Sequence, residues 1–229
     1  MKLDIIIPTL NERENLIKII PYLKDNISLD TNVYVVDSVR SKDNSIEICL
    51  QHDIHYIKSD YACRSIQMNI GARAGKGDCL LFLHADVVPP SQFQSHISNA
   101  INQGYKVGFF AYKFDSSSWL LKINSFFTRF DGMFAGGGDQ CQFFTRDLFE
   151  KYNGYDEDCE IMEDFDMIKR LRNKNESMTI IKDPAIVSAR KYKNNSYLKV
   201  NFINLMTFMK FKNNVSSKEL KLYYNKSLN

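Results

Sequence analysis

The feature that most constrains the fold is an alternation of short apolar runs with helix-like segments over the first 86 residues. Each run is rich in isoleucine, valine or leucine, a composition typical of strands buried on both faces. Such alternation predicts a parallel, doubly wound α/β sheet. The expected strands are residues 3–7, 33–36, 54–57 and 80–83, and the expected helices follow Asn11 as N-cap and span residues 43–50 and 64–74.

Polar residues stand at the carboxyl ends of three of these strands. In a parallel sheet the carboxyl ends meet at one edge, and ligands bind in the crevice beyond them. We therefore expect the three strand ends to converge on one site. The residues concerned are Pro8 and Thr9 after the first strand, Asp37 after the second, and His84, Ala85 and Asp86 after the fourth.

Two of these carboxylates have a chemical and a structural interpretation each. Asp86 can bind a divalent cation that in turn binds a diphosphate, because Mg²⁺ and Mn²⁺ prefer hard oxygen ligands. It can also cap a helix beginning near Pro89. Asp37 can accept hydrogen bonds from a nucleobase or a ribose hydroxyl. Alternatively, the loop after Asp37 only caps the next helix, through Ser41 or Asp43.

The second half of the chain is less regular. Its expected strands are residues 105–114, 141–145, 178–181 and 185–187, and its expected helices are residues 119–130, 162–173, 196–211 and 216–224. Glu163 and Asp164 begin one of these helices. They are either first-turn acids that favour the helix dipole or a general base that activates a hydroxyl. The glycine run 136–138, followed by Asp139 and Gln140, predicts a turn that can approach a ligand closely.

Composition narrows the class of protein. The chain has 229 residues, 44% of them hydrophobic and 25% charged, and a net charge of +3, which is too small to indicate nucleic-acid binding. The five cysteines are widely spaced without a CxxC pair, which indicates reduced thiols and a cytoplasmic location. No signal-peptide pattern and no apolar run of membrane-spanning length is present.

Basic residues gather in the tail, where ten Lys or Arg follow position 181 against two acids, Asp183 and Glu219. The segment 197–211 is apolar around much of its circumference. Interfacial membrane helices and helices packed on a domain core share this pattern. The narrow polar stripe of Asn201, Asn204 and Thr207 favours the packed helix, and we expect weak peripheral membrane contact at most.

Four ordered blocks resemble the family 2 glycosyltransferases of the GT-A fold. They are residues 5–12 as the opening strand and nucleotide-binding turn, residues 35–37 as the strand with the base-binding aspartate, residues 84–86 in the place of the Asp-x-Asp metal motif, and Glu163-Asp164 as the catalytic motif. Further matches are similar to small bacterial transferases assigned to arsenosugar biosynthesis. They are residues 64–72, 82–86, 138–140, 162–164 and 188–190.

The resemblance implies a mixed, mostly parallel sheet flanked by helices in residues 1–190, with a helical appendage in residues 191–229 packed on it. It also implies inverting transfer of a hexosyl or related sugar from a nucleotide-diphosphate donor to an unknown acceptor, with Mn²⁺ or Mg²⁺ as cofactor. Asp86, with His84, would bind the cation, and Asp164, with Glu163, would be catalytic. The donor would contact Pro8, Thr9, Asn11, Glu12, Asp37, Arg64, Gln67, Asn69 and Ala85, and the acceptor side would be Gly138, Asp139 and Gln140.

Two departures from the family pattern concern the donor site. The loop after Asp37 has one extra residue and lacks the usual glycines, and His84 replaces the first aspartate of the metal motif. Two other functions stay open. One is a non-catalytic nucleotide-sugar-binding protein. The other, a nucleotidyltransferase, is disfavoured because the turn after the first strand has no glycine.

Overall fold

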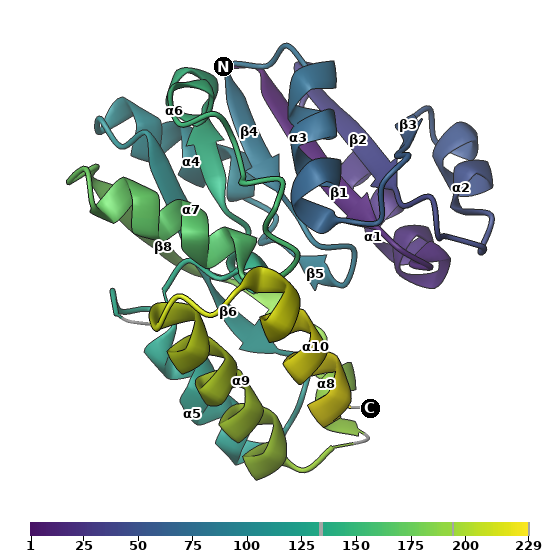
Figure 1. Ribbon diagram of the computed structural model, residues 1–229. Helices are drawn as coiled ribbons and strands as arrows, with labels where there is room; N and C mark the ends of the chain where they lie inside the picture. Colours follow the sequence, from purple (N-terminus) through teal and green to yellow (C-terminus); the bar gives the residue numbers. More distant parts are fainter. Residues whose placement is uncertain (133–134, 194, 229) are drawn as a thin grey trace.

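The computed structural model describes residues 1–132, 135–193 and 195–228. In this part of the chain one eight-stranded sheet has helices on both faces (Figure 1). The strands are β1 (Leu3–Thr9), β2 (Thr31–Asp37), β3 (His55–Lys58), β4 (Cys79–Phe82), β5 (Val87–Val88), β6 (Val107–Phe114), β7 (Phe143–Thr145) and β8 (Met178–Val187). The helices are α1 (Arg13–Asn26), α2 (Ser45–Gln51), α3 (Arg64–Ala74), α4 (Phe93–Asn102), α5 (Trp119–Phe127), the 3₁₀ turn η1 (Gly138–Gln140), α6 (Arg146–Lys151), α7 (Glu163–Arg172), α8 (Arg190–Lys193), α9 (Tyr197–Lys212) and α10 (Ser217–Leu228).

The strand order across the sheet is β3-β2-β1-β4-β7-β6-β8-β5. The strands β3, β2, β1 and β4 are parallel neighbours, and β6 pairs in parallel with β8. β7 lies antiparallel between β4 and β6, and β5 pairs antiparallel with β8. The predicted fold class, a mixed and mostly parallel sheet flanked by helices, is therefore confirmed.

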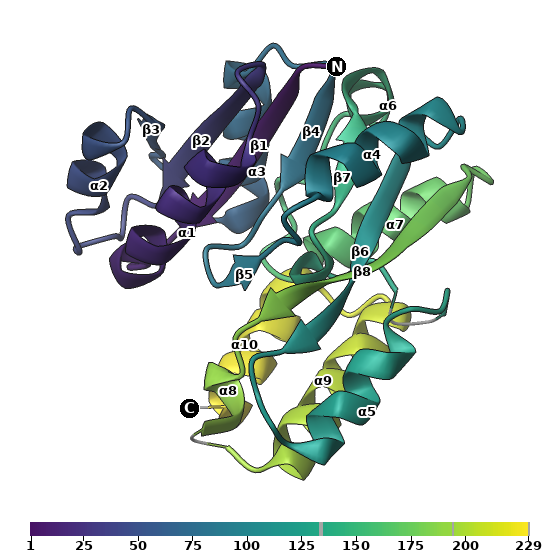
Figure 2. The same ribbon diagram turned by 180° about the vertical axis from the view of Figure 1, so that it is seen from behind.

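The side chains of β1 alternate between two cores, one on each face of the sheet. Ile5 and Ile7 pack with residues of α1 and α4, whereas Ile6 packs with residues of α3, α6 and α7. This alternation follows from the two-residue period of a strand. All three isoleucines are fully buried, as the unbroken apolar run predicted. Figures 1 and 2 show the two helical layers from opposite sides.

The structure corrects two expectations about element bounds. Helix α1 has Glu12 at its N-cap, because Asn11 takes a left-handed backbone conformation with φ 56°. The two strands expected at 178–181 and 185–187 are one strand, β8. Its register with β6 shifts between Phe110 and Tyr112, which places Pro184 in an irregular stretch where its missing N–H is tolerated.

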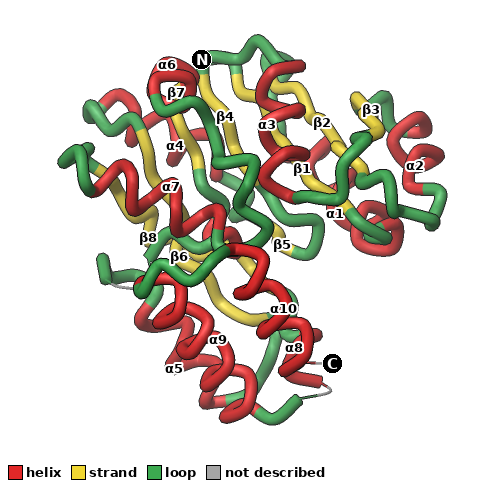
Figure 3. The backbone as a smooth tube through the Cα atoms, viewed as in Figure 1, coloured by secondary structure: helices red, strands yellow, loops and turns green. Residues whose placement is uncertain are grey.

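The helices that follow β8 extend the molecule at the end where β6 and β8 finish (Figure 3). α10 packs on α9, and α9 lies beside α5 in both ribbon views (Figures 1 and 2). Hydrogen bonds join α5 to α9, from Asn124 to Asn201 and from Tyr197 to Asn124. The boundary between residues 190 and 191 stays a prediction, and α8 begins at that point.

Candidate active site

The carboxyl ends of β1, β2 and β4 bring the predicted polar residues to one edge of the sheet. Thr9 ends β1 and Asp37 ends β2, and these two residues are paired in the register of the sheet. The Thr9 hydroxyl donates a hydrogen bond of 2.9 Å to Asp37 Oδ1. His84, Ala85 and Asp86 follow β4, which pairs with the other side of β1. The expected convergence of the strand ends is therefore present.

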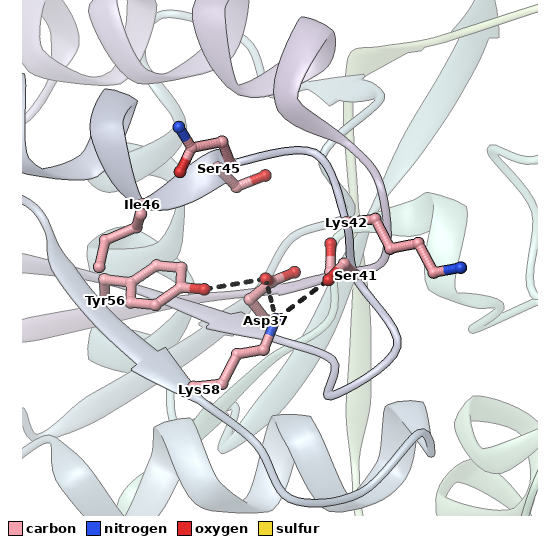
Figure 4. A pocket seen from close by; sticks show the side chains of 8 residues that line it. Asp37, Ser41, Lys42, Ser45, Ile46, Tyr56 and Lys58 are labelled. Atoms are coloured by element: carbon pink, nitrogen blue, oxygen red, sulfur yellow. Dashed lines mark hydrogen bonds and ion pairs between the residues drawn. The ribbon is translucent and has the colours of Figure 1, made fainter.

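Asp37 lies at the base of a cavity of about 380 Å³ (Figure 4). Its Oδ2 accepts hydrogen bonds of 2.9 Å from the Tyr56 hydroxyl and from Lys58 Nζ. The carboxylate is buried, and Lys58 is half-exposed. The cavity is lined by Asp37, Ser41, Lys42, Asn44, Ser45, Ile46, Tyr56 and Lys58.

Tyr56 and Lys58 were missed by sequence reasoning. They alternate along β3, and β3 pairs with the end of β2 so that Lys58 lies opposite Asp37. Two residues two apart on a strand face the same side. Lys58 lies one residue beyond the strand expected at 54–57, and the pairing of β3 with β2 depends on strand order, so no local signal indicated the Tyr-x-Lys pair.

The loop after Asp37 is held against the turn between β1 and α1. The Asn11 backbone N–H donates to Ser41 Oγ, and Asn11 Oδ1 accepts from the Lys42 N–H. Asp43 accepts from the Arg13 N–H and from two serine hydroxyls, so these bonds lower the pKa of Asp43 against the raising effect of burial. Asp43 is thus a structural brace, and the N-cap of α2 is Asn44, which corrects the expected capping by Ser41 or Asp43.

Gln67 and Asn69, expected to frame the donor, use their buried amides within the protein. Gln67 Nε2 donates to the carbonyls of Thr9 and Val36, at 2.8 and 2.7 Å, and so ties β1 to β2. Asn69 exchanges hydrogen bonds with the backbone of Tyr155. Both residues therefore support the crevice from behind in this structure.

Asp86 lies next to a guanidinium group. Arg190 Nε is 3.2 Å from Asp86 Oδ2, and the same guanidinium donates to both carboxylate oxygens of Glu12, at 2.8 and 3.2 Å. Burial raises the pKa of Asp86, and Arg190 opposes this rise. Helix α4 has Gln92 at its N-cap, so the alternative role of Asp86 as a helix cap is wrong. Arg190 joins β8 to the turns after β1 and β4.

A divalent cation at this site would take few of its ligands from the protein. Among the described residues no group of three or more His, Cys, Asp or Glu side chains is placed to hold a metal ion. Mg²⁺ and Mn²⁺ commonly use one or two carboxylates and complete their shell with water and substrate phosphate oxygens. Asp86 offers one such carboxylate. Metal ligation by Asp86 and His84 stays a prediction.

Glu163 and Asp164 lie in the first turn of α7, after Met162 at the N-cap. Both side chains are buried. Arg64, at the start of α3, forms an ion pair with Glu163 through its Nε. Burial raises the pKa of Glu163, but the charge of Arg64 outweighs it and holds that pKa below its usual value. Burial, and then the negative charge of Glu163, raise the pKa of Asp164 to about 7.

The Asp164 carboxylate accepts no hydrogen bond from any residue that the structure describes. It lies against the glycine turn, where a Cβ added to Gly138 would be 2.5 Å from both Asp164 Oδ2 and His84 Cε1. His84 Nδ1 is 3.5 Å from Asp139 Oδ1. Burial lowers the pKa of His84, but the contact with Asp139 outweighs it and raises this pKa. The structure thus gathers His84, Gly138, Asp139 and Asp164.

Two buried glutamines hold this turn in place. Gln140, expected on the acceptor side, accepts from the Gly136 N–H at 2.6 Å and donates to the Phe110 carbonyl. Gln142, which sequence reasoning missed, donates to the carbonyls of Gly136 and Asp164 and accepts from the Tyr155 hydroxyl. Both residues therefore act as supports of the turn.

Comparison with known proteins identifies the class to which this fold and site belong. The sequence profile described as glycosyl transferase family 2 matches residues 4–152. The chain belongs to this family. No match was found among curated proteins.

Solved structures confirm the GT-A fold. The chain superposes on S. aureus TarS 1–349 with a TM-score of 0.67 at 12% identity, covering 100% of this chain and 71% of that one. The superposition on TarS 1–349 in complex with UDP-GlcNAc has a TM-score of 0.67 at 13% identity and covers 100% of this chain and 72% of that one. A third superposition is on the mannosyltransferase PcManGT from Pyrobaculum calidifontis in complex with GDP-Man and Mn²⁺. It has a TM-score of 0.69 at 13% identity and covers 91% of this chain and 61% of that one.

Proposed function

We propose that this protein transfers a hexosyl or related sugar from a nucleoside-diphosphate sugar to an acceptor hydroxyl, with a divalent cation and with inversion at the anomeric carbon. The observation that carries the proposal is the state of Asp164. It is a buried carboxylate with a pKa near 7 and no hydrogen bond from the described residues. A general base works best when its pKa lies near the operating pH and its oxygen can reach the proton that it removes.

The donor would bind from the Asp37 cavity towards Asp86. The cavity contains a carboxylate, hydroxyl groups and the Lys58 ammonium, which together can hold a base and ribose. Thr9 orients Asp37, and the resemblance assigns further donor contacts to Pro8 and Ala85. Structural neighbours in complex with UDP-GlcNAc and GDP-Man support a nucleotide sugar as the donor class.

The diphosphate would lie beside the ion pair of Asp86 and Arg190. Asp86 would hold Mn²⁺ or Mg²⁺, and the cation would neutralise negative charge on the leaving diphosphate. The Arg190 guanidinium, now shared by Asp86 and Glu12, adds a second positive charge beside the same oxygens. Mn²⁺ in the structure of PcManGT supports the choice of cation.

Asp164 would accept the proton of the acceptor hydroxyl. The hydroxyl oxygen would then form a bond to the anomeric carbon as the bond from this carbon to the diphosphate breaks on the opposite face. Glu163 would keep Arg64 beside Asp164, and Gly138 with Asp139 would line the acceptor side. The motif likeness supports the arsenosugar subgroup, and the five free thiols support a cytoplasmic location.

Calorimetric titration with UDP and with GDP, with and without Mn²⁺, tests the proposal. We expect Mn²⁺ to increase the affinity of the wild-type protein for one of them, and Asp86→Ala to abolish this increase. Asp25→Ala, an exposed carboxylate on α1, is the matched control and should behave as wild type. Mn²⁺-dependent binding without turnover of any nucleotide sugar would favour a non-catalytic binding protein. Unchanged affinity in Asp86→Ala would remove Asp86 from the cation site.

A further inference from the structure

Helices α5 and α9 expose two apolar stripes to solvent. On α5 and just beyond it, Trp119, Ile123, Phe126, Phe127 and Phe130 are exposed, and on α9 Leu198, Phe202, Leu205 and Met209 are exposed. Trp119 is 68% exposed and Leu198 is 77% exposed. Within each set the spacing is i, i+4, i+7 and i+11, with Phe127 at i+8, which places the residues on one side of the helix. We call these nine residues the α5–α9 face.

The α5–α9 face is not used to join the two helices. Asn124 and Asn201, with Tyr197, make the hydrogen bonds between them. The side of α9 that packs inward carries Val200, Ile203 and Phe208. The expectation of a packed helix therefore holds for one side of α9, while its opposite side is also apolar. Of the polar stripe, Thr207 is buried, Asn201 is partly buried and Asn204 is exposed. Large apolar residues that are exposed together on neighbouring helices often mark a site of interaction.

The charged residues within the two segments that form the face are all positive, and the acid next to it, Asp131, is paired with Arg172. Residues 116–130 and 195–215 contain no acidic residue, and the cations among them are Lys122, Arg129, Lys199, Lys210 and Lys212. Among the described residues none of these five forms an ion pair; Lys199 Nζ contacts Asn195 and Lys210 Nζ lies over the Tyr223 ring. Their charge is thus available to a negatively charged surface.

We infer that the α5–α9 face docks on a bilayer surface that carries anionic lipid headgroups. Aromatic and aliphatic side chains would enter the interface while the cations contact the headgroups, the arrangement of an interfacial helix. None of the described helices is both long and apolar enough to span a bilayer, so the helices would lie along the surface. A second copy of the chain is a poorer occupant, because a two-fold contact would bring the cations of both copies together.

The single tryptophan of the chain reports on this face directly. Trp119 is the only tryptophan in the sequence, so its emission can be recorded from the unmodified full chain. Vesicles containing about one quarter phosphatidylglycerol should shift the emission to shorter wavelength, and brominated lipids should quench it. Pure phosphatidylcholine vesicles should give a much smaller shift, since each cation near an anionic surface is worth roughly a fivefold change in partitioning.

Paired variants test the apolar side chains and the cations of the α5–α9 face separately. Phe126→Gln with Phe202→Gln should lower the vesicle partition coefficient by at least about tenfold, and Lys122→Gln with Lys199→Gln should lower it only for anionic vesicles and more strongly at low salt. The matched control is Leu29→Gln with Leu50→Gln, two exposed apolar positions elsewhere. It should not change the vesicle partition coefficient. The inference is overturned if anionic vesicles leave the emission unchanged. It is also overturned if the shift appears without vesicles as protein concentration rises and is lost in the phenylalanine variant, because a second copy then covers the face. Both results are independent of sugar transfer.

Discussion

Two adjacent carboxylates at the start of α7 are separated in pKa by a single guanidinium. Arg64 contacts Glu163 and keeps it charged, while Asp164 has no such partner among the described residues. Burial and the neighbouring charge then raise the pKa of Asp164 to about 7. Pairs of titratable groups whose surroundings push their pKa values apart are typical of acid–base sites. Glu163 is therefore best understood as the residue that sets the pKa of Asp164.

This arrangement predicts how the rate depends on pH. A general base acts in its deprotonated form, so kcat/KM should fall as the pH drops below about 7, the pKa of Asp164. In Glu163→Gln the neighbouring negative charge is removed, so the pKa of Asp164 falls and the inflection should move to lower pH by roughly one unit or more. Asp164→Asn should lose the inflection and lower turnover by about two to four orders of magnitude.

Initial rates of donor turnover between pH 5 and 9, in the three proteins, are the measurement. Glu150→Gln, an exposed carboxylate on α6, is the control and should keep the wild-type profile. An inflection that stays in place in Glu163→Gln would mean that another group controls the rate.

The positions of residues that lie at the end of their own strand or at a helix start could be predicted from the sequence. Residues that reach the site from another strand could not. Asp37, Asp86 and Asp164 stand directly after a strand or at a helix start, so the local pattern indicates them. Tyr56 reaches Asp37 only because β3 pairs with β2, and Arg190 reaches Asp86 only because the end of β8 pairs with β5, the strand that follows Asp86. Such contacts depend on strand order, which one sequence does not specify.

At the scale of elements, the 3₁₀ turn η1 lies against the first turn of α7. Gly138 is the point of closest approach, since no Cβ fits between it and the side chains of His84 and Asp164. The glycine run predicted a close approach, but the element approached is a helix of the same chain, which the sequence alone does not show.

Gly138→Ala should therefore displace Asp164 or His84 and leave the nucleotide cavity intact. A displacement of about 1 Å of a catalytic group can cost roughly a hundredfold in rate, so we expect turnover to fall by about ten- to a hundredfold. Affinity for the nucleoside diphosphate should stay unchanged. Gly132→Ala, where an added Cβ meets no described residue within 4 Å, is the control. Equal turnover in both variants would show that this contact does not position the base.

Elements that end at a clear local signal were predicted most closely. α3 begins and ends where its pattern predicted, because Gly75 follows its last residue. β8 was divided in two because Pro184 normally ends a strand, and only the register shift against β6 lets the strand continue. The pairing of β8 with β6 thus keeps the strand continuous, although Pro184 is a local signal for a strand end.

At the scale of the whole molecule, a buried ion pair joins the two halves of the sequence. Asp4 on β1 is fully buried and Arg146 begins α6, with Arg146 Nη2 2.8 Å from Asp4 Oδ2. Arg146 also donates to the carbonyls of Gly77 and Ala72. The pair fixes β1, which ends at Thr9 beside Asp37, to the segment that follows the antiparallel strand β7.

Removing one partner of this pair should destabilise the protein strongly. In Arg146→Met the Asp4 carboxylate stays buried without its cation, and we expect the free energy of unfolding to fall by about 3 kcal/mol. Asp4→Asn combined with Arg146→Met should lose less than Arg146→Met alone, because a neutral amide costs less to bury than a charge and its oxygen can still accept from the Gly77 N–H. Lys106→Met, which breaks an exposed ion pair with Asp147, should change the free energy of unfolding by less than about 1 kcal/mol. Urea unfolding followed by tryptophan emission measures the free energy of unfolding of these three variants. If Arg146→Met costs no more than Lys106→Met, the two halves are held together by their shared hydrophobic core and the ion pair is incidental to stability.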